Sequence, residues 1–216
     1  MPANEGSLPL IEQNWPGLLA ITSFNLIAFG AVAAIDPKPF SELATAWAFL
    51  LPAGVGLAMI RVVSGLFSTT AKDRLVFISH WKHPLPGSRA FTVHAKDDDR
   101  FTEEEVHKKF HVTAAIKKDP KEQNAHWYKE VYFPVQDMPS VQQAHRNFLF
   151  TRDYAVISFA MLIALGAAGF FVIAPWTHWA LYCGGLFLQY LLVRQAAQNY
   201  GIEMVKDALA AGVAHP

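Results

Sequence analysis

Four runs of apolar residues, two towards each end of the chain, alternate with polar segments. They cover residues 17–35, 43–60, 154–176 and 178–193, and none contains Asp, Glu, Lys or Arg. A helix needs about 17–25 apolar residues to cross a bilayer core of about 30 Å. We therefore predict an all-α membrane protein with four transmembrane helices as two hairpins. The fourth run is the shortest, and it reaches this length only if Arg194 extends to the interface.

The polar segment between the second and third runs predicts a small helical cytosolic insert. A helix is expected to continue without a break from the second run to Trp81, where His-Pro-Leu-Pro-Gly at 83–87 forms a corner, because proline removes a backbone donor. Thr102 and Glu105 have the spacing of a capping box. Ser140 is the expected cap of a helix that runs into the third apolar run.

These elements divide the chain into three predicted parts. Residues 1–67 form the N-terminal tail and first hairpin, 68–153 the insert, and 154–216 the second hairpin and C-terminal tail. At the start of the third run, Arg152 and Asp153 are expected to form ion pairs between helices.

Lysine and arginine flank the apolar runs almost wholly on one side. Of the 18 Lys and Arg, only Lys38 lies between the first two runs and none lies between the last two. Because positive residues near span ends stay cytoplasmic, we predict a multi-pass inner-membrane protein with the insert and both termini in the cytoplasm. Glu5 and Glu12 precede the first run without any Lys or Arg, which favours a retained span over a cleaved signal peptide.

Polar and small residues within the runs indicate how the spans associate. No Asp, Glu, Lys, Arg or His lies near the middle of a run, which argues against an ion-coupled transporter. Asn25 and Gln189 can form interhelical hydrogen bonds or, in a homo-oligomer, line a pore. Small residues permit close helix packing, within one chain or between copies, at Gly54, Ala58, Gly166, Gly169, Gly184 and Gly185.

Composition agrees with a membrane protein and limits the chemistry of the chain. It is 52% hydrophobic and 17% charged with a formal net charge of zero, whereas about 25% charged residues is usual for soluble domains. The single cysteine, Cys183, excludes an intrachain disulfide and a cysteine-based zinc site.

Two pairs of histidines are the candidate metal ligands. His80 and His83 lie three residues apart, and His107 and His111 lie four apart on a predicted helix, where they would share one face. With a nearby carboxylate such a pair can bind zinc. No HExxH or CxxC motif supports the site, so the absence of a cofactor is the favoured expectation.

A ligand or partner site is the second candidate. Lys82 and Arg89 can bind phosphate, and Trp127 and Tyr128 can stack on a base or a partner surface. The chain has no glycine-rich phosphate loop, dinucleotide fingerprint or nucleophile elbow, and no feature that points to nucleic acid.

Three segments carry a resemblance to known proteins: "HPLPGSRAF", "EQNAHWY" and "AHRNFLFTRD", lying between paired spans. They resemble a family of small four-span bacterial inner-membrane proteins, which implies that fold and location but no established activity. The architecture is also similar to membrane components of bacterial anti-phage operons. That similarity implies activity through assembly and membrane perturbation, with sensing by a partner.

Two classes of function follow. The favoured one is a non-enzymatic membrane protein that oligomerises and couples a cytosolic signal or a soluble cytosolic partner to the lipid bilayer, as a pore-forming or anchoring component of a defence system. The alternative is a metal-dependent membrane-bound enzyme that uses the histidines and glutamates of the insert.

Overall fold

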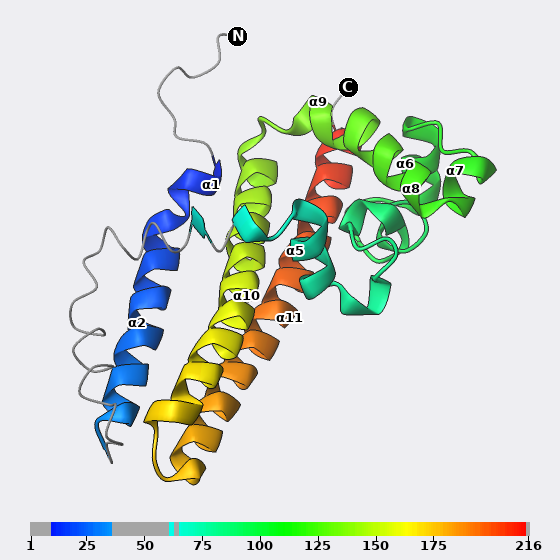
Figure 1. The fold of residues 1–216 in the computed structure, drawn as a ribbon. Helices are drawn as coiled ribbons and strands as arrows, with labels where there is room; N and C mark the ends of the chain where they lie inside the picture. The colour runs from blue at the N-terminus through cyan, green and yellow to red at the C-terminus, as the bar shows by residue number, and fades with distance from the viewer. Residues whose placement is uncertain (1–9, 36–60, 63–64, 215–216) are drawn as a thin grey trace. The chain divides into compact units, whose positions relative to one another are not determined.

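The computed structural model describes residues 10–35, 61–62 and 65–214, and these ranges are helical with no β-strand, which confirms the predicted all-α class (Figure 1). Short 3₁₀ turns η1 (Ile78–His80), η2 (Pro86–Arg89) and η3 (His94–Lys96) and a π-helical turn η4 (Trp127–Tyr132) connect the α-helices. The α-helices are α1 (Leu10–Gln13), α2 (Trp15–Ala33), α5 (Thr69–Val76), α6 (Glu103–Lys109), α7 (Ala114–Lys118), α8 (Pro120–His126), α9 (Phe133–Val135), α10 (Pro139–Val172) and α11 (Trp176–Ala214).

The chain forms two compact units. The first, called here the hairpin unit, comprises Met1–Lys72 and Arg152–Arg194; the second, the insert unit, comprises Asp73–Thr151 and Gln195–Pro216. Both α10 and α11 therefore contribute residues to each unit. The stretch from Gln195 onward belongs to the insert unit, whereas the sequence suggested a tail of the second hairpin.

Two helices of the described chain, not four, are long and apolar enough to cross a membrane. They are α2, with 19 residues, and α10, with 34. The second predicted span, residues 43–60, lies outside the described residues. The fourth run is helical within α11, but His178 and Gln189 and the polar groups beside them lower its hydropathy over a membrane-length window.

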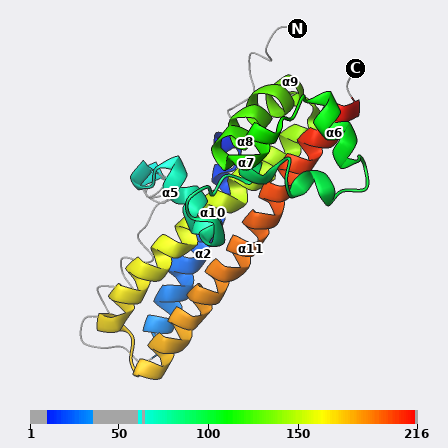
Figure 2. The same cartoon turned by 90° about the vertical axis from the view of Figure 1, so that its right-hand side faces the viewer.

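The hairpin unit is built on α10 and α11, which run antiparallel side by side in both ribbon views (Figures 1 and 2). A small core joins α2 to the closed end of this hairpin, with Phe29 and Ile173 buried at its centre. The ring of Phe29 lies 5.7 Å from that of Tyr182, whose hydroxyl donates to the Asn25 carbonyl at 3.3 Å. Trp179 Nε1 donates to the Gly166 carbonyl at 2.8 Å, which ties α11 to α10.

The second half of α11 is a core helix of the insert unit. Val205, Ala208 and Leu209 are fully buried. Gly201 lets the helix approach two aromatic rings, because a Cβ there would lie 2.9 Å from Phe77 and 3.0 Å from Phe148. The insert unit therefore depends on the end of the chain for its core.

Several helices begin at residues that are typical of helix N-termini. Thr102 and Glu105 form the predicted capping box at α6. Pro120 opens α8, with Asp119 as its cap. Trp127 and Val131, four residues apart, are both buried.

Two local predictions were wrong. The helix expected to run unbroken to Trp81 is interrupted at Phe67 and Ser68, where the Ser68 hydroxyl accepts from the Ala71 amide at 3.2 Å, and α5 ends before Phe77 leaves helical geometry. Ser140 lies inside α10, which begins at Pro139, and so is not its cap. The predicted continuity of this helix into the third apolar run is confirmed.

Candidate functional site

The proline-rich stretch forms a rigid corner of the insert unit. Pro84, Pro86 and Gly87 are buried, and the last two open the turn η2. A Cβ at Gly87 would lie 2.6 Å from Asn124 Oδ1 and 2.6 Å from Trp127 Cε3. The corner therefore packs against α8 and η4 with no room for a side chain at this position.

Beside the corner lies a cavity of about 420 Å³, called here the basic pocket. Lys82 and Arg89, two of the predicted ligand-binding residues, line it together with the candidate metal ligands His80 and His83. Ser79, Trp81, Ser88 and Pro120 also line it, and in the part of the chain that the structure describes no carboxylate belongs to the wall.

Arg89 is half-buried in the wall of the basic pocket. Its guanidinium carbon lies 5.9 Å from the centre of the Phe77 ring, and within the described ranges it forms no ion pair with a carboxylate. Burial lowers the pKa of Arg89, because the charged form loses hydration that no anion replaces.

Arg100, in the same unit, differs from Arg89 because carboxylates pair with its guanidinium group. It contacts Asp98 at 2.7 Å and Asp207 at 2.6 Å. These carboxylates raise the pKa of Arg100, chiefly through the hydrogen bonds that Arg100 donates to Asp98. Arg100 is a structural cation, whereas Arg89 is a cation exposed to a cavity.

His80 shares the positive potential of the basic pocket. The Ser79 hydroxyl lies 2.9 Å from its Nδ1. Partial burial, and then the charge of Arg89, lower the pKa of His80. Both effects favour the neutral imidazole while the pocket contains no anion.

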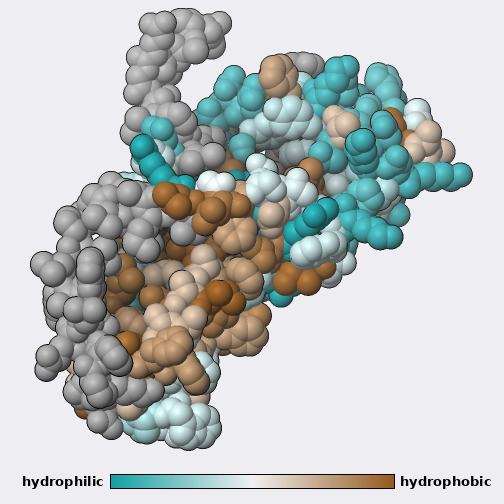
Figure 3. Space-filling model, viewed as in Figure 1, coloured by the Kyte–Doolittle hydropathy of each residue, from teal (hydrophilic) through white to brown (hydrophobic). Residues whose placement is uncertain are grey.

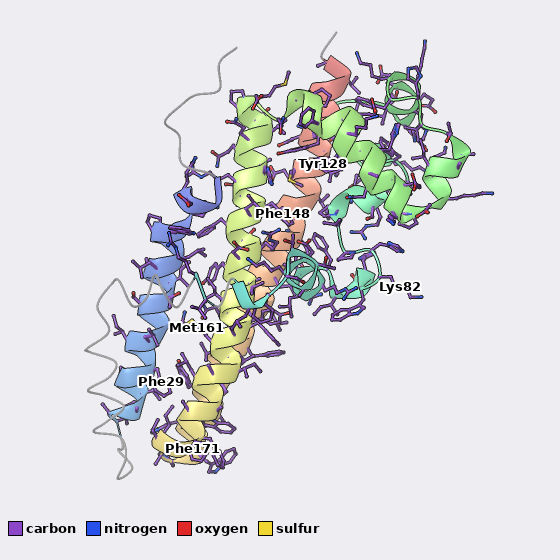
Figure 4. All side chains as sticks on the ribbon, turned by 45° about the horizontal axis from the view of Figure 1, so that its top comes forward. Phe29, Lys82, Tyr128, Phe148, Met161 and Phe171 are labelled. Atoms are coloured by element: carbon purple, nitrogen blue, oxygen red, sulfur yellow. The ribbon has the colours of Figure 1, made fainter. Side chains whose placement is uncertain are left out.

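The two aromatic residues proposed for the ligand site lie elsewhere. Trp127 is buried with its ring 5.5 Å from that of Tyr132, and the exposed Tyr128 ring stacks on the same Tyr132 ring at 5.5 Å. Lys82 and Tyr128 lie well apart on the insert unit (Figure 4). The structure thus separates the predicted cations from the predicted stacking residues.

The second histidine pair does not share a helical face. The helix α6 ends at Lys109, and His111 beyond it has a positive φ of 51°. His107 Nε2 lies 2.9 Å from the Phe91 carbonyl oxygen and 3.7 Å from Glu103 Oε1. Within the part of the chain that the structure describes, no group of three or more His, Cys, Asp or Glu is arranged to hold a metal ion. Zinc binding remains a prediction from the sequence.

A charged network that the sequence did not indicate joins the η3 region to α11. Lys206 Nζ contacts Asp97 at 2.8 Å and also donates to the Asp97 carbonyl. Beside it, His94 is buried and its Nε2 has no hydrogen-bond partner among the described protein atoms. Burial, with the charges of Arg89 and Lys206, lowers the pKa of His94 to about 4.

In the hairpin unit, the predicted ion pairing between helices is present. Asp153 of α10 accepts from Lys72 of α5 at 3.2 Å and from Arg152 at 3.4 Å. All three side chains are buried. Removing one member of such a buried set is expected to be costly, because the remaining charges lose compensation.

Several polar and small residues of the predicted spans form contacts within a helix or between neighbouring helices. Asn25 donates to the Ile21 carbonyl at 3.0 Å within α2. Gln189 donates to the Tyr154 hydroxyl at 3.0 Å, which links α11 to α10. A Cβ at Gly166 or Gly169 would lie 3.5 Å from Cys183 Sγ and 3.0 Å from Trp179 Cδ1, respectively. Gly54 and Ala58 lie outside the described residues.

Comparison with known proteins gives no family assignment. A scan against protein-family models, a search of curated proteins and a search of solved structures each found no match. The candidate site is therefore defined by the geometry of the insert unit alone.

Proposed function

We propose that this chain is a non-enzymatic integral protein of a bacterial inner membrane that oligomerises and couples a cytosolic signal or partner to the bilayer. One observation supports this function above the others: the chain separates an outwardly apolar hairpin unit from a polar insert unit, and two long helices contribute to both.

The apolar surface of the hairpin unit supports membrane insertion. Phe24 on α2, Phe171 on α10 and Leu181 on α11 are 69%, 68% and 75% exposed. Figure 3 shows apolar residues gathered over the described helices of this unit, whereas the insert unit is mainly hydrophilic. Contiguous apolar surface of this kind is unfavourable in water and suits lipid.

The pairing of α10 and α11 supports a hairpin that crosses the bilayer twice. If α10 crosses the bilayer, the antiparallel α11 must cross it in the opposite direction. The polar groups of α11 are compatible with such a crossing because they form hydrogen bonds within the unit. Gln189 bonds to Tyr154, and Trp179 bonds to the Gly166 carbonyl. With residues 17–35 and 43–60 as the first hairpin, the proposed topology has four spans with the insert and both termini cytoplasmic.

Continuous helices provide a route for coupling. α10 passes from Pro139 to Val172 and α11 from Trp176 to Ala214 without interruption. Binding at the insert unit can therefore bias the positions of both helices in the membrane. A pore-forming or anchoring role in defence, as the architectural resemblance implies, would use this coupling to alter the membrane.

An exposed small-residue face of α11 supports oligomerisation. A Cβ at Gly184 or Gly185 would meet no atom within 4 Å, and Leu181 and Leu188 flank these glycines in a shallow groove. In lipid, small residues permit a second helix to approach closely. We propose that copies of the chain associate through this face.

Mass measurement in nanodiscs tests the proposal. The wild-type chain is expected to form a defined multimer, and Gly185→Leu is expected to reduce the multimer to smaller species because leucine fills the groove. Ala168→Leu on an exposed position of α10 is the matched control and should leave the mass unchanged. A wild-type monomer would contradict the oligomeric function, and extraction of the protein by alkaline carbonate would contradict its membrane insertion.

A further inference from the structure

The basic pocket has a charge imbalance that its own unit does not correct. Lys82, Arg89 and two imidazoles line a cavity of about 420 Å³, and no carboxylate is among the described residues of its wall. Asp97 and Asp98 follow the pocket residues in the sequence, but they pair with Lys206 and Arg100 instead. The cations of the pocket are thus left for an anion from outside the chain.

The geometry of the pocket is held before any ligand binds. Gly87 packs directly against Asn124 and Trp127, which fixes the turn η2 that carries Arg89. Trp81, which also lines the pocket, is held by Arg74: Arg74 Nε donates to the Trp81 carbonyl at 3.2 Å, and the Arg74 guanidinium carbon lies 5.4 Å from the Trp81 ring centre. Binding of an anion would therefore require little ordering of the backbone, which lowers its entropic cost.

The chemistry of the lining favours a phosphate group over a simple halide. Arg89 offers a planar pair of donors, Lys82 a mobile ammonium group, and Ser88 a hydroxyl. This combination suits the several acceptor oxygens of a phosphate monoester or diester. The ring N–H of His80 or His83 would add one further donor.

Exposed apolar side chains lie in the same stretch of sequence as the residues that line the pocket. Ile78, Trp81 and Leu85 are 44%, 54% and 38% exposed, and Trp81 also lines the cavity. Aromatic and apolar groups beside cations are typical of surfaces that lie at the headgroup level of a bilayer. A bound phosphate could therefore carry an acyl chain.

We propose that the basic pocket is a binding site for a phosphate-bearing anion, with Arg89 and Lys82 as its principal charge partners. The shared recognised group is the phosphate, and its source is either a phospholipid headgroup or a soluble phosphate compound. Binding itself does not depend on the function proposed above; only the role of the ligand as the signal for the membrane spans rests on that function.

The first experiment uses soluble probes on the detergent-solubilised full chain. Inorganic phosphate and glycerol phosphate are titrated by calorimetry at constant ionic strength, with chloride as the reference anion. We expect saturable binding that is weakened about 10-fold or more in Lys82→Gln and in Arg89→Gln, because each removes a charged hydrogen bond. Lys108→Gln, which removes an exposed cation outside the pocket, is the matched control.

The second experiment identifies the source of the phosphate. The chain is placed in nanodiscs of phosphatidylcholine containing phosphatidylglycerol, and retained lipid is counted by native mass spectrometry. Retention of phosphatidylglycerol by wild type and its loss in Lys82→Gln would assign a lipid headgroup, whereas binding of soluble probes alone would assign a soluble compound.

Absence of binding in both experiments, or equal binding by wild type and Lys82→Gln, would overturn the proposal. Lys82 is exposed, so its replacement keeps the test valid even if Arg89→Gln does not fold. Because the soluble-probe experiment uses no bilayer and no mass of an oligomer, its failure is distinguishable from failure of the membrane function.

Discussion

His94 is expected to make the insert unit sensitive to mild acid. Burial, Arg89 and Lys206 lower the pKa of this histidine from 6.5 to about 4, and Asp97 and the Pro86 carbonyl only partly oppose them. In the unfolded chain the imidazole binds a proton near its ordinary pKa, whereas in the folded unit it stays neutral. Stability is therefore complete above pH 6.5, falls as the pH drops towards about 4, and falls no further below it from this cause.

The size of the effect follows from proton linkage. With values of 6.5 in the unfolded chain and about 4 in the folded unit, the free energy of unfolding decreases by about 2 kcal/mol at about pH 5, and by about 3 kcal/mol at the limit. The pKa values of Asp97 and Asp98 are lowered from 3.8 by their bonds to Lys206 and Arg100. Their stabilising effect is lost only in more acidic solution, so the two windows are separate.

Hydrogen exchange measures this loss locally. Protection of peptides covering residues 86–101, corrected for intrinsic exchange rates, is expected to fall about 20-fold between about pH 7 and about pH 5. His94→Gln should remove most of this dependence, while His111→Gln, which replaces an exposed imidazole, should retain it. An equal fall in His94→Gln would refute the assignment to His94.

One substitution in each unit, with a control variant beside it, tests the contacts of that unit. Gly87→Ala would place a Cβ 2.6 Å from Asn124 Oδ1, so we expect a loss of about 1–3 kcal/mol in thermal unfolding. Gly65→Ala, where nothing lies within 4 Å, should change stability by less than about 0.5 kcal/mol, and equal effects would argue against the rigid corner. In the hairpin unit, Asp153→Asn should cost about 3 kcal/mol in denaturant unfolding because Lys72 stays buried beside a neutral amide. The double variant Lys72→Met, Asp153→Leu should recover much of this loss, and a single variant as stable as the double would count against a coupled pair.

Local chemistry made much of the insert predictable. The capping box of Thr102 and Glu105 involves residues three apart, and the corner at Pro84 and Pro86 follows from the covalent geometry of proline. The continuity of α10 could be predicted because no proline or glycine interrupts its polar first half. Each of these signals is complete within a few residues of the chain.

Long-range packing accounts for what the sequence did not predict. The second half of α11 looks like a polar tail, but Gly201 and the buried face around Val205 allow it to enter the core of the insert unit. The bonds of Lys206 to Asp97 and of Arg100 to Asp207 join residues 109 and 107 positions apart. No local pattern indicates such pairs.

Local sequence signals indicated only part of the candidate site. Lys82 and Arg89 lie on either side of a corner that the prolines indicate, so their shared pocket follows from local geometry. Trp127 does not join them because its helical face turns into the core. The spacing of His107 and His111 suggested one helical face only on the assumption that the helix continued past Lys109.

Cysteine labelling tests the central claim, that the hairpin unit crosses a bilayer and leaves the insert unit on the cytoplasmic side. The chain contains one cysteine, so Cys183→Ser provides a clean background. Single cysteines are then placed at two exposed positions, Thr177 at the start of α11 and Lys118 in α7. In spheroplasts treated with a membrane-impermeant maleimide, we expect Thr177→Cys to react directly and Lys118→Cys to react only after permeabilisation. Equal labelling of both positions in intact spheroplasts would contradict the account.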